Sequence, residues 1–260
     1  MVGRGEVLER MTTVPSASGP LEALWQAGGV GVEHRMPILV CPPHPRLGGS
    51  MDSAILAEIV WQLARRHHPT LRFNHAGVSA SAGTLALPWL PTTDVVDLTP
   101  LVDDAKAALA QLLASTGARE IGVVGVSVGA LVAARLLLEH DAVIAGALVA
   151  PPLLGVVGPG LAIDIEALRT LQAGGCPMVI VVGEADTLVN ADDIDAAINP
   201  PATGVANASR ASQPRLRVER ISGADHSFQR GMSACARAVV DTFGGPDDDD
   251  DDDDDDDHHR

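Results

Sequence analysis

Aromatic residues are scarce in this chain of 260 residues: they make up 2% of it, and tyrosine is absent. Apolar residues nevertheless account for 46% of the sequence, so the chain can bury a sizeable core and global disorder is excluded. With so few aromatic rings, that core must consist mainly of Ala, Val, Leu and Ile. The length is enough for one α/β domain of ordinary size or for two small domains.

Cysteine is even rarer than the aromatic residues. The chain has three cysteines, Cys41, Cys176 and Cys235, which are widely spaced and form no Cys-x-x-Cys pair. This pattern argues against a disulfide framework and a structural zinc site, and it favours a reducing compartment. The pair His67-His68 has no acidic or cysteine partner at ligand spacing, so we expect no metal.

Long uninterrupted apolar runs are also missing. The apolar stretch Ala147–Ile163 is broken by three prolines and several glycines, which excludes it as a membrane span. The first residues, Met1–Met11, carry a charge every few positions and contain no apolar segment like that of a signal peptide. We therefore expect a cytoplasmic protein that does not contact membranes.

The net charge of −16 comes mostly from eleven consecutive aspartates, Asp247–Asp257. Removing those 11 from the 34 acidic residues leaves 23 acidic against 18 basic side chains, so there is no basic excess to bind nucleic acid. We expect residues 246–260 to form a disordered, solvated tail. An alternative is that the tail contacts a cation or a basic partner, although no glycine-spaced loop fixes a coordination geometry there.

Short β-rich runs alternate with helical patterns along most of the chain, which is typical of a sheet with crossover helices. Several runs are almost wholly apolar, as expected for parallel strands covered on both faces. The first run is mixed and fits an antiparallel edge strand. The predicted strands are Leu21–Trp25, Pro37–Cys41, Leu71–Asn74, Glu120–Val126, Ala145–Ala150, Pro177–Val182 and Arg215–Ile221.

Helical patterns lie between these strands. Ser50 can cap a helix whose apolar stripe begins at Ile55, and Thr99 followed by proline is typical of an N-cap with proline at the first helical position. The segment Asn199–Gln213 is rich in Pro, Ala, Ser and Asn and predicts a surface loop. The whole pattern indicates a single α/β domain over residues 1–245. The other predicted helices are Ser127–Glu139, Asp192–Ile198 and Gln229–Phe243.

The segment Gly125-Val126-Ser127-Val128-Gly129 matches the pattern Gly-x-Ser-x-Gly, in which a serine occupies a sharp turn between a strand and a helix. Chance alone gives roughly 0.13 matches in a chain of this composition, so the pattern by itself is weak evidence. Its context is more specific, because an apolar strand pattern precedes Ser127 and an apolar helical pattern follows it. We therefore predict that Ser127 is a nucleophile; the alternative is a glycine-rich structural turn.

A serine nucleophile needs a base, and the base needs a third group that orients it. In this architecture the acid and then the histidine follow later strands. The strand ending at Val182 leads into Gly-Glu-Ala-Asp, and the last strand leads into Ala-Asp-His. Asp186 is therefore the predicted acid and His226 the predicted base, with Glu184 as the rival acid.

The loop that follows the Pro37–Cys41 strand is a candidate for one half of an oxyanion hole. Acyl transfer needs two backbone N–H groups aimed at the developing negative charge, and Val128, directly after the nucleophile, can supply one. The loop reads Pro-Pro-His-Pro-Arg-Leu-Gly-Gly, and its prolines have no N–H. Arg46 or Leu47 is therefore the candidate for the second donor, while His44 more plausibly braces the loop than takes part in the chemistry.

Five motifs occur in order along the chain: Pro-His-Pro-x-x-Gly-Gly-Ser-Met-Asp at 43–52, Phe-Asn-x-x-Gly-Val at 73–78, Gly-x-Ser-x-Gly-Ala at 125–130, Gly-Glu-x-Asp at 183–186 and Ala-Asp-His at 224–226. Together they resemble compact bacterial α/β-hydrolases, namely the dienelactone-hydrolase-like group and small serine hydrolases with a His-Pro-x-x-Gly-Gly loop. The resemblance implies the α/β-hydrolase fold, a triad of Ser127, Asp186 and His226, no cofactor, and action on carboxylic esters and related acyl bonds.

The resemblance also has departures. Relatives usually carry an aromatic residue and an arginine where this chain has His75-Ala76, so substrate specificity does not carry over. His44, Asn74 and His75 are candidates for the substrate pocket. The stretch 151–176 is too short for a large cap domain, which predicts an open site for a small or exposed ester.

Two other classes of function remain open from the sequence. The same triad serves thioesterases, acyltransferases and peptidase-like enzymes, because all of them handle the acyl group through the same tetrahedral intermediate. A non-catalytic module with this fold, which would bind a ligand or partner, usually has a broken triad. The substrate is in each case expected to be a small molecule with an ester or acyl group.

Overall fold

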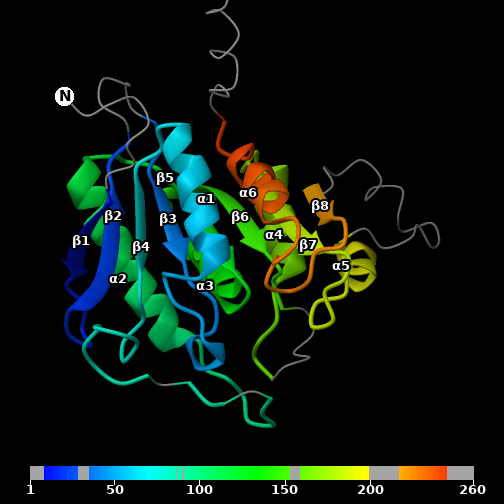
Figure 1. The fold of residues 1–260 in the computed structure, drawn as a ribbon, viewed down its shortest axis with the longest axis horizontal. Helices are drawn as coiled ribbons and strands as arrows, with labels where there is room; N and C mark the ends of the chain where they lie inside the picture. Colours follow the sequence, from blue (N-terminus) through cyan, green and yellow to red (C-terminus); the bar gives the residue numbers. More distant parts are fainter. Residues whose placement is uncertain are drawn as a thin grey trace, which may run out of the picture.

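The computed structural model describes residues 9–28, 35–85, 87–89, 91–152, 159–198 and 217–244. These residues form one mixed sheet with helices on both faces (Figure 1). The strands are β1 (Glu9–Val14), β2 (Leu21–Gln26), β3 (Ile38–Cys41), β4 (Thr70–Phe73), β5 (Ile121–Val126), β6 (Val143–Val149), β7 (Met178–Gly183) and β8 (Arg217–Ile221). The helices are η1 (Pro45–Leu47, a 3₁₀ turn), α1 (Ala54–Arg65), α2 (Thr99–Thr116), α3 (Val128–Glu139), α4 (Ile165–Ala173), α5 (Ala191–Ile198) and α6 (Met232–Val240).

The strands are ordered β1-β2-β4-β3-β5-β6-β7-β8 across the sheet. The first two lie antiparallel to their neighbours, and all pairs from β4 to β8 are parallel. The parallel strands therefore direct their carboxyl ends, and the loops that follow them, to one edge of the sheet. In Figure 1 the loops after β3 and β4 lie at the lower edge of the molecule.

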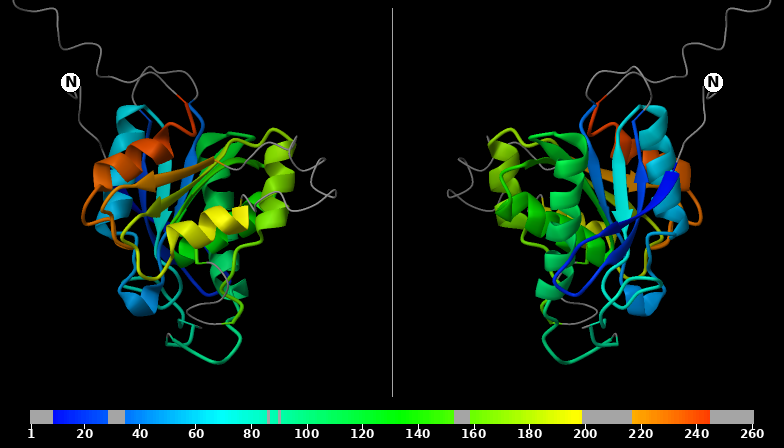
Figure 2. Two further views of the ribbon diagram at one scale, coloured as in Figure 1. Left: turned by 90° about the vertical axis from the view of Figure 1, so that its right-hand side faces the viewer. Right: turned by 90° about the vertical axis from the view of Figure 1, so that its left-hand side faces the viewer.

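The core consists of two apolar layers, one on each face of the sheet. Helices α1 and α6 cover one face, and α2, α3 and α4 cover the other (Figure 2). The strand β5 is buried at all six positions, and α3 buries nine of its residues, all Val, Leu, Ala or Gly. Small and branched residues thus do the packing that the scarcity of aromatic rings predicts.

The sequence-based prediction of an α/β fold is confirmed, but the first strand of the sheet was missed. All five residues of β1 before Val14 are exposed or half-exposed, and its sequence is mostly charged and polar. Such an edge strand lacks the apolar alternation from which strands are recognised. Consequently β2, which was expected at the edge, lies inside the sheet between β1 and β4.

The helix starts are shifted slightly from those expected. α1 begins at Ala54 with Ser53 as its N-cap, so the expected cap at Ser50 is wrong; the Ser53 hydroxyl instead donates to the Ser50 carbonyl in a turn. Similarly, α2 has Leu98 at its N-cap and Thr99 as its first helical residue. Several polar residues that could serve as N-caps lie within three positions of the start of each helix. The sequence pattern alone therefore does not identify the N-cap residue.

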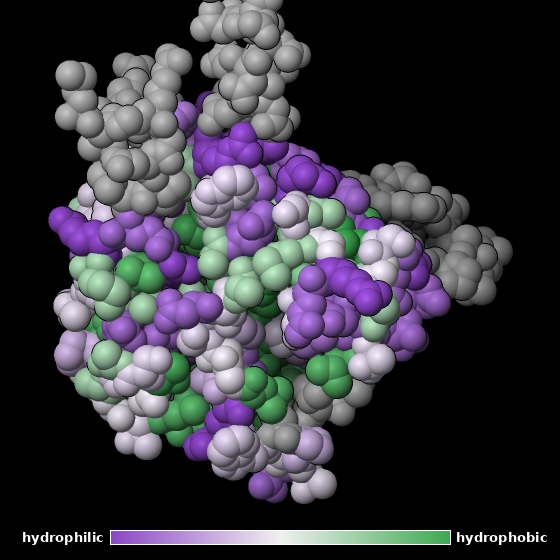
Figure 3. Space-filling view, in the orientation of Figure 1, coloured by the Kyte–Doolittle hydropathy of each residue, from purple (hydrophilic) through white to green (hydrophobic). Residues whose placement is uncertain are grey.

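Part of the prediction falls outside the described residues, namely the tail 246–260, the loop Asn199–Gln213 as a whole and most of the N-terminal segment. Between β6 and β7, α4 is the one helix in the described residues, and they contain no cap domain. No helix in the described ranges is both long and apolar enough to cross a bilayer. On the face shown in Figure 3, apolar side chains gather in the lower half, near the loops that follow the strands.

Candidate active site

Ser127 occupies a sharp turn between β5 and α3. Its backbone has φ 54° and ψ −122°, a left-handed conformation that a residue with a side chain rarely adopts and that costs of the order of 1–3 kcal/mol. Gly125 and Gly129 make the turn possible: a Cβ on Gly125 would lie 2.1 Å from the Gly129 carbonyl oxygen, and one on Gly129 would lie 2.4 Å from that of Cys41. The two glycines therefore let α3 pack directly against β5 and the end of β3.

The structure brings Ser127 together with His226 and Asp186, which come from the loops after β8 and β7. The Nε2 atom of His226 lies 3.0 Å from the Ser127 hydroxyl, and its Nδ1 atom lies 2.8 Å from Asp186 Oδ2. The imidazole thus bridges a hydroxyl and a carboxylate at hydrogen-bonding distance on both sides. In this arrangement Nδ1–H donates to Asp186, and Nε2 is left to accept the serine proton.

Asp186 is held in place by its own loop. Its Oδ1 accepts hydrogen bonds from the amides of Leu188 and Val189, at 2.8 and 2.9 Å, which leaves Oδ2 for the imidazole. The carboxylate side chain is 0% exposed, whereas Glu184, the rival acid, is exposed. Of the two acids considered, Asp186 is the one that the structure places beside His226.

The loop after β3 folds into the 3₁₀ turn η1, next to the start of α3. The amide of Leu47 donates to the His44 carbonyl at 3.0 Å, and the amides of Gly48 and Gly49 donate to the carbonyls of Pro45 and His44. The Leu47 N–H is therefore hydrogen-bonded within the turn and is not available as an oxyanion donor in this conformation. Arg46 lies in the first turn of η1, where amides have no intrahelical acceptor. Its amide therefore stays the candidate for the second oxyanion donor, together with the amide of Val128.

Comparison with known families extends these observations. Residues 47–171 match the model of the family described as serine aminopeptidase, S33. An uncharacterised protein of Rickettsia prowazekii, RP471, is 26% identical over 204 residues, which are 78% of this chain and 76% of the relative. The family match includes the turn at Ser127, and the match to RP471 spans most of the chain. The similarity is therefore not confined to one short motif.

Several solved structures share the fold over nearly their whole length. An α/β serine hydrolase homologue from Coxiella burnetii superimposes with a TM-score of 0.68 at 23% identity and covers 90% of this chain and 97% of its own. XC6422 of Xanthomonas campestris, an α/β serine hydrolase without a lid, gives 0.65 at 20% identity over 90% and 93%. The Pyrococcus furiosus esterase Pf2001 gives 0.63 at 17% identity over 94% and 96%.

The chain therefore has the α/β-hydrolase fold. The described residues contain no cluster of three or more His, Cys, Asp or Glu side chains that would hold a metal ion. The expected nucleophile turn, base and acid all occur at the carboxyl edge of the parallel strands, where this class of sheet places its functional loops. The relationship of the His-Pro loop to a particular subgroup stays a prediction.

His44 is part of the loop after β3, and its side chain is buried in the interior. Its side chain is 2% exposed, and neither ring nitrogen has a hydrogen-bond partner among the described residues. Burial, followed by the nearby positive charges of Arg46 and His75, lowers the pKa of His44 to about 4. The His44 imidazole is therefore buried and neutral at pH 7, and its role in the substrate pocket stays a prediction.

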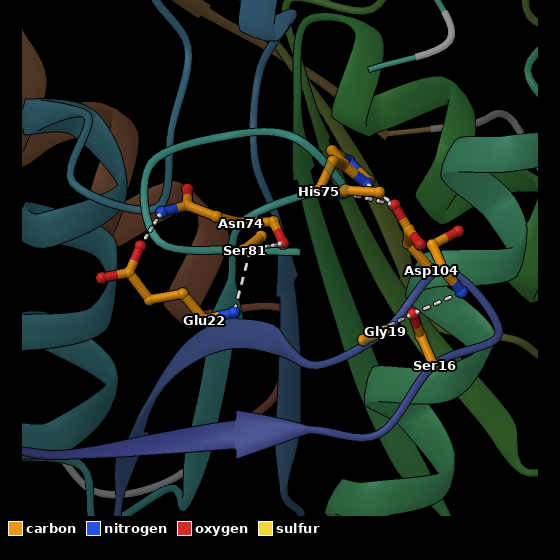
Figure 4. A network of polar contacts seen from close by, with 9 residues as sticks. Ser16, Gly19, Glu22, Asn74, His75, Ser81 and Asp104 are labelled. Carbon is orange, nitrogen blue, oxygen red and sulfur yellow. Dashed lines mark hydrogen bonds and ion pairs between the residues drawn. The ribbon is translucent and has the colours of Figure 1, made fainter. Parts of the chain in front are cut away.

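Asn74 and His75 also turn out to be interior residues. The Asn74 amide group donates to Glu22 Oε2 at 2.9 Å and accepts from the Met51 amide at 2.8 Å, which uses both of its ends (Figure 4). Ser81 closes the same turn by donating to the Asn74 carbonyl. Asn74 is 0% and His75 1% exposed, and Asn74 ties the loops after β3 and β4 to β2. Their role in the substrate pocket stays a prediction.

His75 pairs with a carboxylate that sequence analysis missed. Its Nδ1 atom lies 3.3 Å from Asp104 Oδ2, and the same oxygen accepts from the Ala76 amide at 2.9 Å (Figure 4). Asp104 is 4% exposed on the apolar face of α2, next to Leu101 and Ala105. A charged residue within an apolar helical stripe was the available signal, because buried carboxylates require partners.

Proposed function

We propose that this chain, which has the α/β-hydrolase fold, is a serine hydrolase that cleaves a carboxylic ester, or a related acyl bond, of a small or exposed substrate through an acyl-enzyme. The observation that carries the proposal is the chain of contacts from Asp186 through His226 to Ser127. No other set of nucleophile, base and acid in the described residues has this geometry.

In the first half-reaction, the Ser127 hydroxyl oxygen attacks the substrate carbonyl carbon while His226 Nε2 takes the hydroxyl proton. Asp186 stabilises the resulting imidazolium through Nδ1–H and keeps the ring oriented. The amides of Val128 and Arg46 would face the negative oxygen of the tetrahedral intermediate; loss of one such donor typically costs a hundred- to a thousand-fold in rate. The C–O bond then breaks as His226 returns the proton to the leaving alcohol.

In the second half-reaction, water replaces the alcohol. His226 removes a proton from the water, whose oxygen attacks the acyl-enzyme carbonyl, and the intermediate collapses to release the carboxylic acid and restore the Ser127 hydroxyl. The absence of a cap domain from the described residues supports an open site. XC6422, which lacks a lid, and the esterase Pf2001 share the fold and point in the same direction.

The test is a substrate screen on wild type and Ser127→Ala. The panel contains p-nitrophenyl esters from C2 to C12, matched acyl thioesters and aminoacyl p-nitroanilides. It separates esterase, thioesterase and peptidase-like activity. The p-nitroanilides are included because the matching family model is described as a serine aminopeptidase. We expect the highest kcat/KM on C2 to C4 esters and no activity above background in Ser127→Ala. A clear preference for C12 contradicts the open site, and turnover retained in Ser127→Ala contradicts the nucleophile.

A further inference from the structure

The side chain of Arg46 connects the candidate oxyanion loop to the long segment between β4 and α2. Its Nε donates to the Leu87 carbonyl, and one terminal nitrogen donates to the Leu85 carbonyl at 3.3 Å. The guanidinium also lies over the indole ring of Trp89, 5.2 Å from the ring centroid. The residue whose amide is the candidate second oxyanion donor thus contacts the neighbouring segment with its side chain.

The segment is anchored again at its other end. The Val96 amide donates to the Pro159 carbonyl at 2.7 Å, and a Cβ on Gly160 would lie 2.6 Å from the Val96 carbonyl oxygen, so the two backbones are in close contact. Arg46 follows β3 and Pro159 follows β6, and β5 lies between these strands in the sheet. The described residues of this segment, 85, 87–89 and 91–96, therefore border the edge at which β5 ends in Ser127.

Two large apolar side chains are exposed at this border. Trp89 is 68% exposed although Arg46 covers part of one face of its ring, and Leu47, next to Arg46 in η1, is 58% exposed. The chain has only three tryptophans, and this one contacts Arg46 at the surface rather than packing in the core. Exposed indole and leucine side chains close to the same arginine are a candidate surface for binding an aromatic group.

We propose that Trp89 and Leu47 form an apolar platform that binds an aromatic ring of the substrate, and that Arg46 is a positioning residue that fixes this platform relative to its own backbone amide. This inference rests on the proposed function and names its substrate class: esters in which the acid or the alcohol carries an aromatic ring. The ring stacks on the free part of the indole while the ester carbonyl reaches Ser127. Arg46 contributes through geometry rather than by touching the reacting atoms with its side chain.

The experiment compares hydrolysis of four esters by pH-stat titration. Phenyl acetate and ethyl acetate differ in the alcohol, and methyl benzoate and methyl acetate differ in the acid, so the pairs distinguish the two sources of the ring. In Trp89→Ala we expect the aryl-to-alkyl ratio of kcat/KM to fall about twofold to twelvefold in one pair, since an aromatic contact of this kind contributes about 0.5–1.5 kcal/mol beyond its area. The matched control is Trp61→Ala: Trp61 is 45% exposed and stacks on Arg65 at 5.1 Å in the same way, but on α1.

Arg46 is tested separately. Arg46→Met should lower kcat on both alkyl and aryl esters with a smaller change in KM, whereas Arg46→Lys, which keeps the cation over the indole, should restore part of kcat; circular dichroism checks that each variant is folded. Equal aryl-to-alkyl ratios in wild type and Trp89→Ala overturn the platform. Failure of wild type to hydrolyse any ester or to react with a small fluorophosphonate overturns the proposed function instead, so the two failures are distinguishable.

Discussion

His226 and Asp186, forty residues apart in the chain, are joined by a contact of 2.8 Å between Nδ1 and Oδ2. The carboxylate is fully shielded from solvent, whereas the imidazole is 23% exposed. The acid is therefore inside the protein, and the base lies at the surface of the site, where it reaches the Ser127 hydroxyl. This asymmetry is what the proposed chemistry requires, because the base exchanges protons with substrate and water while the acid only orients it.

Replacing Asp186 by Asn should lower kcat by up to about ten-thousand-fold, since an amide at this position can stabilise the imidazole tautomer in which Nε2 already carries a proton. The fold should persist because the side-chain oxygen can still accept from the Leu188 and Val189 amides. Steady-state kinetics measures the effect. Glu184→Gln is the control and should leave kcat unchanged; the opposite result for the two variants would assign the acid to Glu184.

Replacing Gly129 by Ala should be far more damaging than an ordinary Gly→Ala change. The added Cβ would lie 2.4 Å from the carbonyl oxygens of Cys41 and Pro42, so α3 would have to move away from β3 and take the Ser127 turn with it. We expect a loss of stability of at least about 3 kcal/mol together with loss of activity.

The control for this steric argument is Gly117→Ala at the end of α2. Gly117 has φ +67° but no atom within 4 Å of a built Cβ, so only the conformational cost of about 1–2 kcal/mol applies. Urea denaturation of both variants gives the comparison. Equal losses of stability would mean that the close approach at Gly129 is not a constraint on the fold.

His44 makes stability depend on pH. Burial lowers its pKa from 6.5 to about 4 in the folded protein, so between these values the unfolded chain binds the proton and the folded chain does not. The free energy of unfolding should therefore fall as the pH is lowered from 6.5 to 4, by roughly 1–3 kcal/mol from this residue. Urea midpoints of wild type and His44→Gln between pH 4 and 7.5 test this.

The expected outcome is a shallower pH slope in His44→Gln than in wild type. His140→Gln, at the half-buried end of α3, is a control that should keep the wild-type slope. His68, whose pKa burial lowers as well, keeps contributing in every variant. Parallel slopes for wild type and His44→Gln would show that His44 is accessible to protons in the folded state.

The cysteines should be unreactive in the native protein. Cys41 and Cys235 are 0% exposed, and burial raises the pKa of both thiols far above their usual range; burial also raises the pKa of the half-buried Cys176. Because the thiolate is the reactive species, iodoacetamide at pH 8 should modify Cys41 and Cys235 only after unfolding, as followed by mass spectrometry. Rapid native alkylation with loss of ester hydrolysis would point to a cysteine nucleophile.

The predictable part of this molecule is the part governed by apolar periodicity and by short turns. The strand leading to Ser127, the glycines beside it and the loops carrying Asp186 and His226 follow from local sequence, because each motif must fit directly against a buried strand. β1 could not be recognised, since a polar edge strand is stabilised by pairing with β2 rather than by its own pattern.

The orientations of Asn74 and His75 could not be predicted from the sequence for a different reason. The directions in which Asn74 and His75 point depend on Glu22 and Asp104, which lie 52 and 29 residues away, and sequence spacing carries no information about such partners. The same holds for the contact between Arg46 and Trp89. A motif locates a loop on the sheet, whereas the tertiary contacts decide which of its side chains face solvent.

Whether Ser127 is a nucleophile activated by His226 is best measured by reaction with a fluorophosphonate, followed by intact-mass analysis and peptide mapping. We expect one adduct per chain, located on Ser127, absent from Ser127→Ala and greatly slowed in His226→Ala, with all three proteins folded by circular dichroism. A folded wild-type protein that stays unmodified, or one modified on another residue, would contradict it.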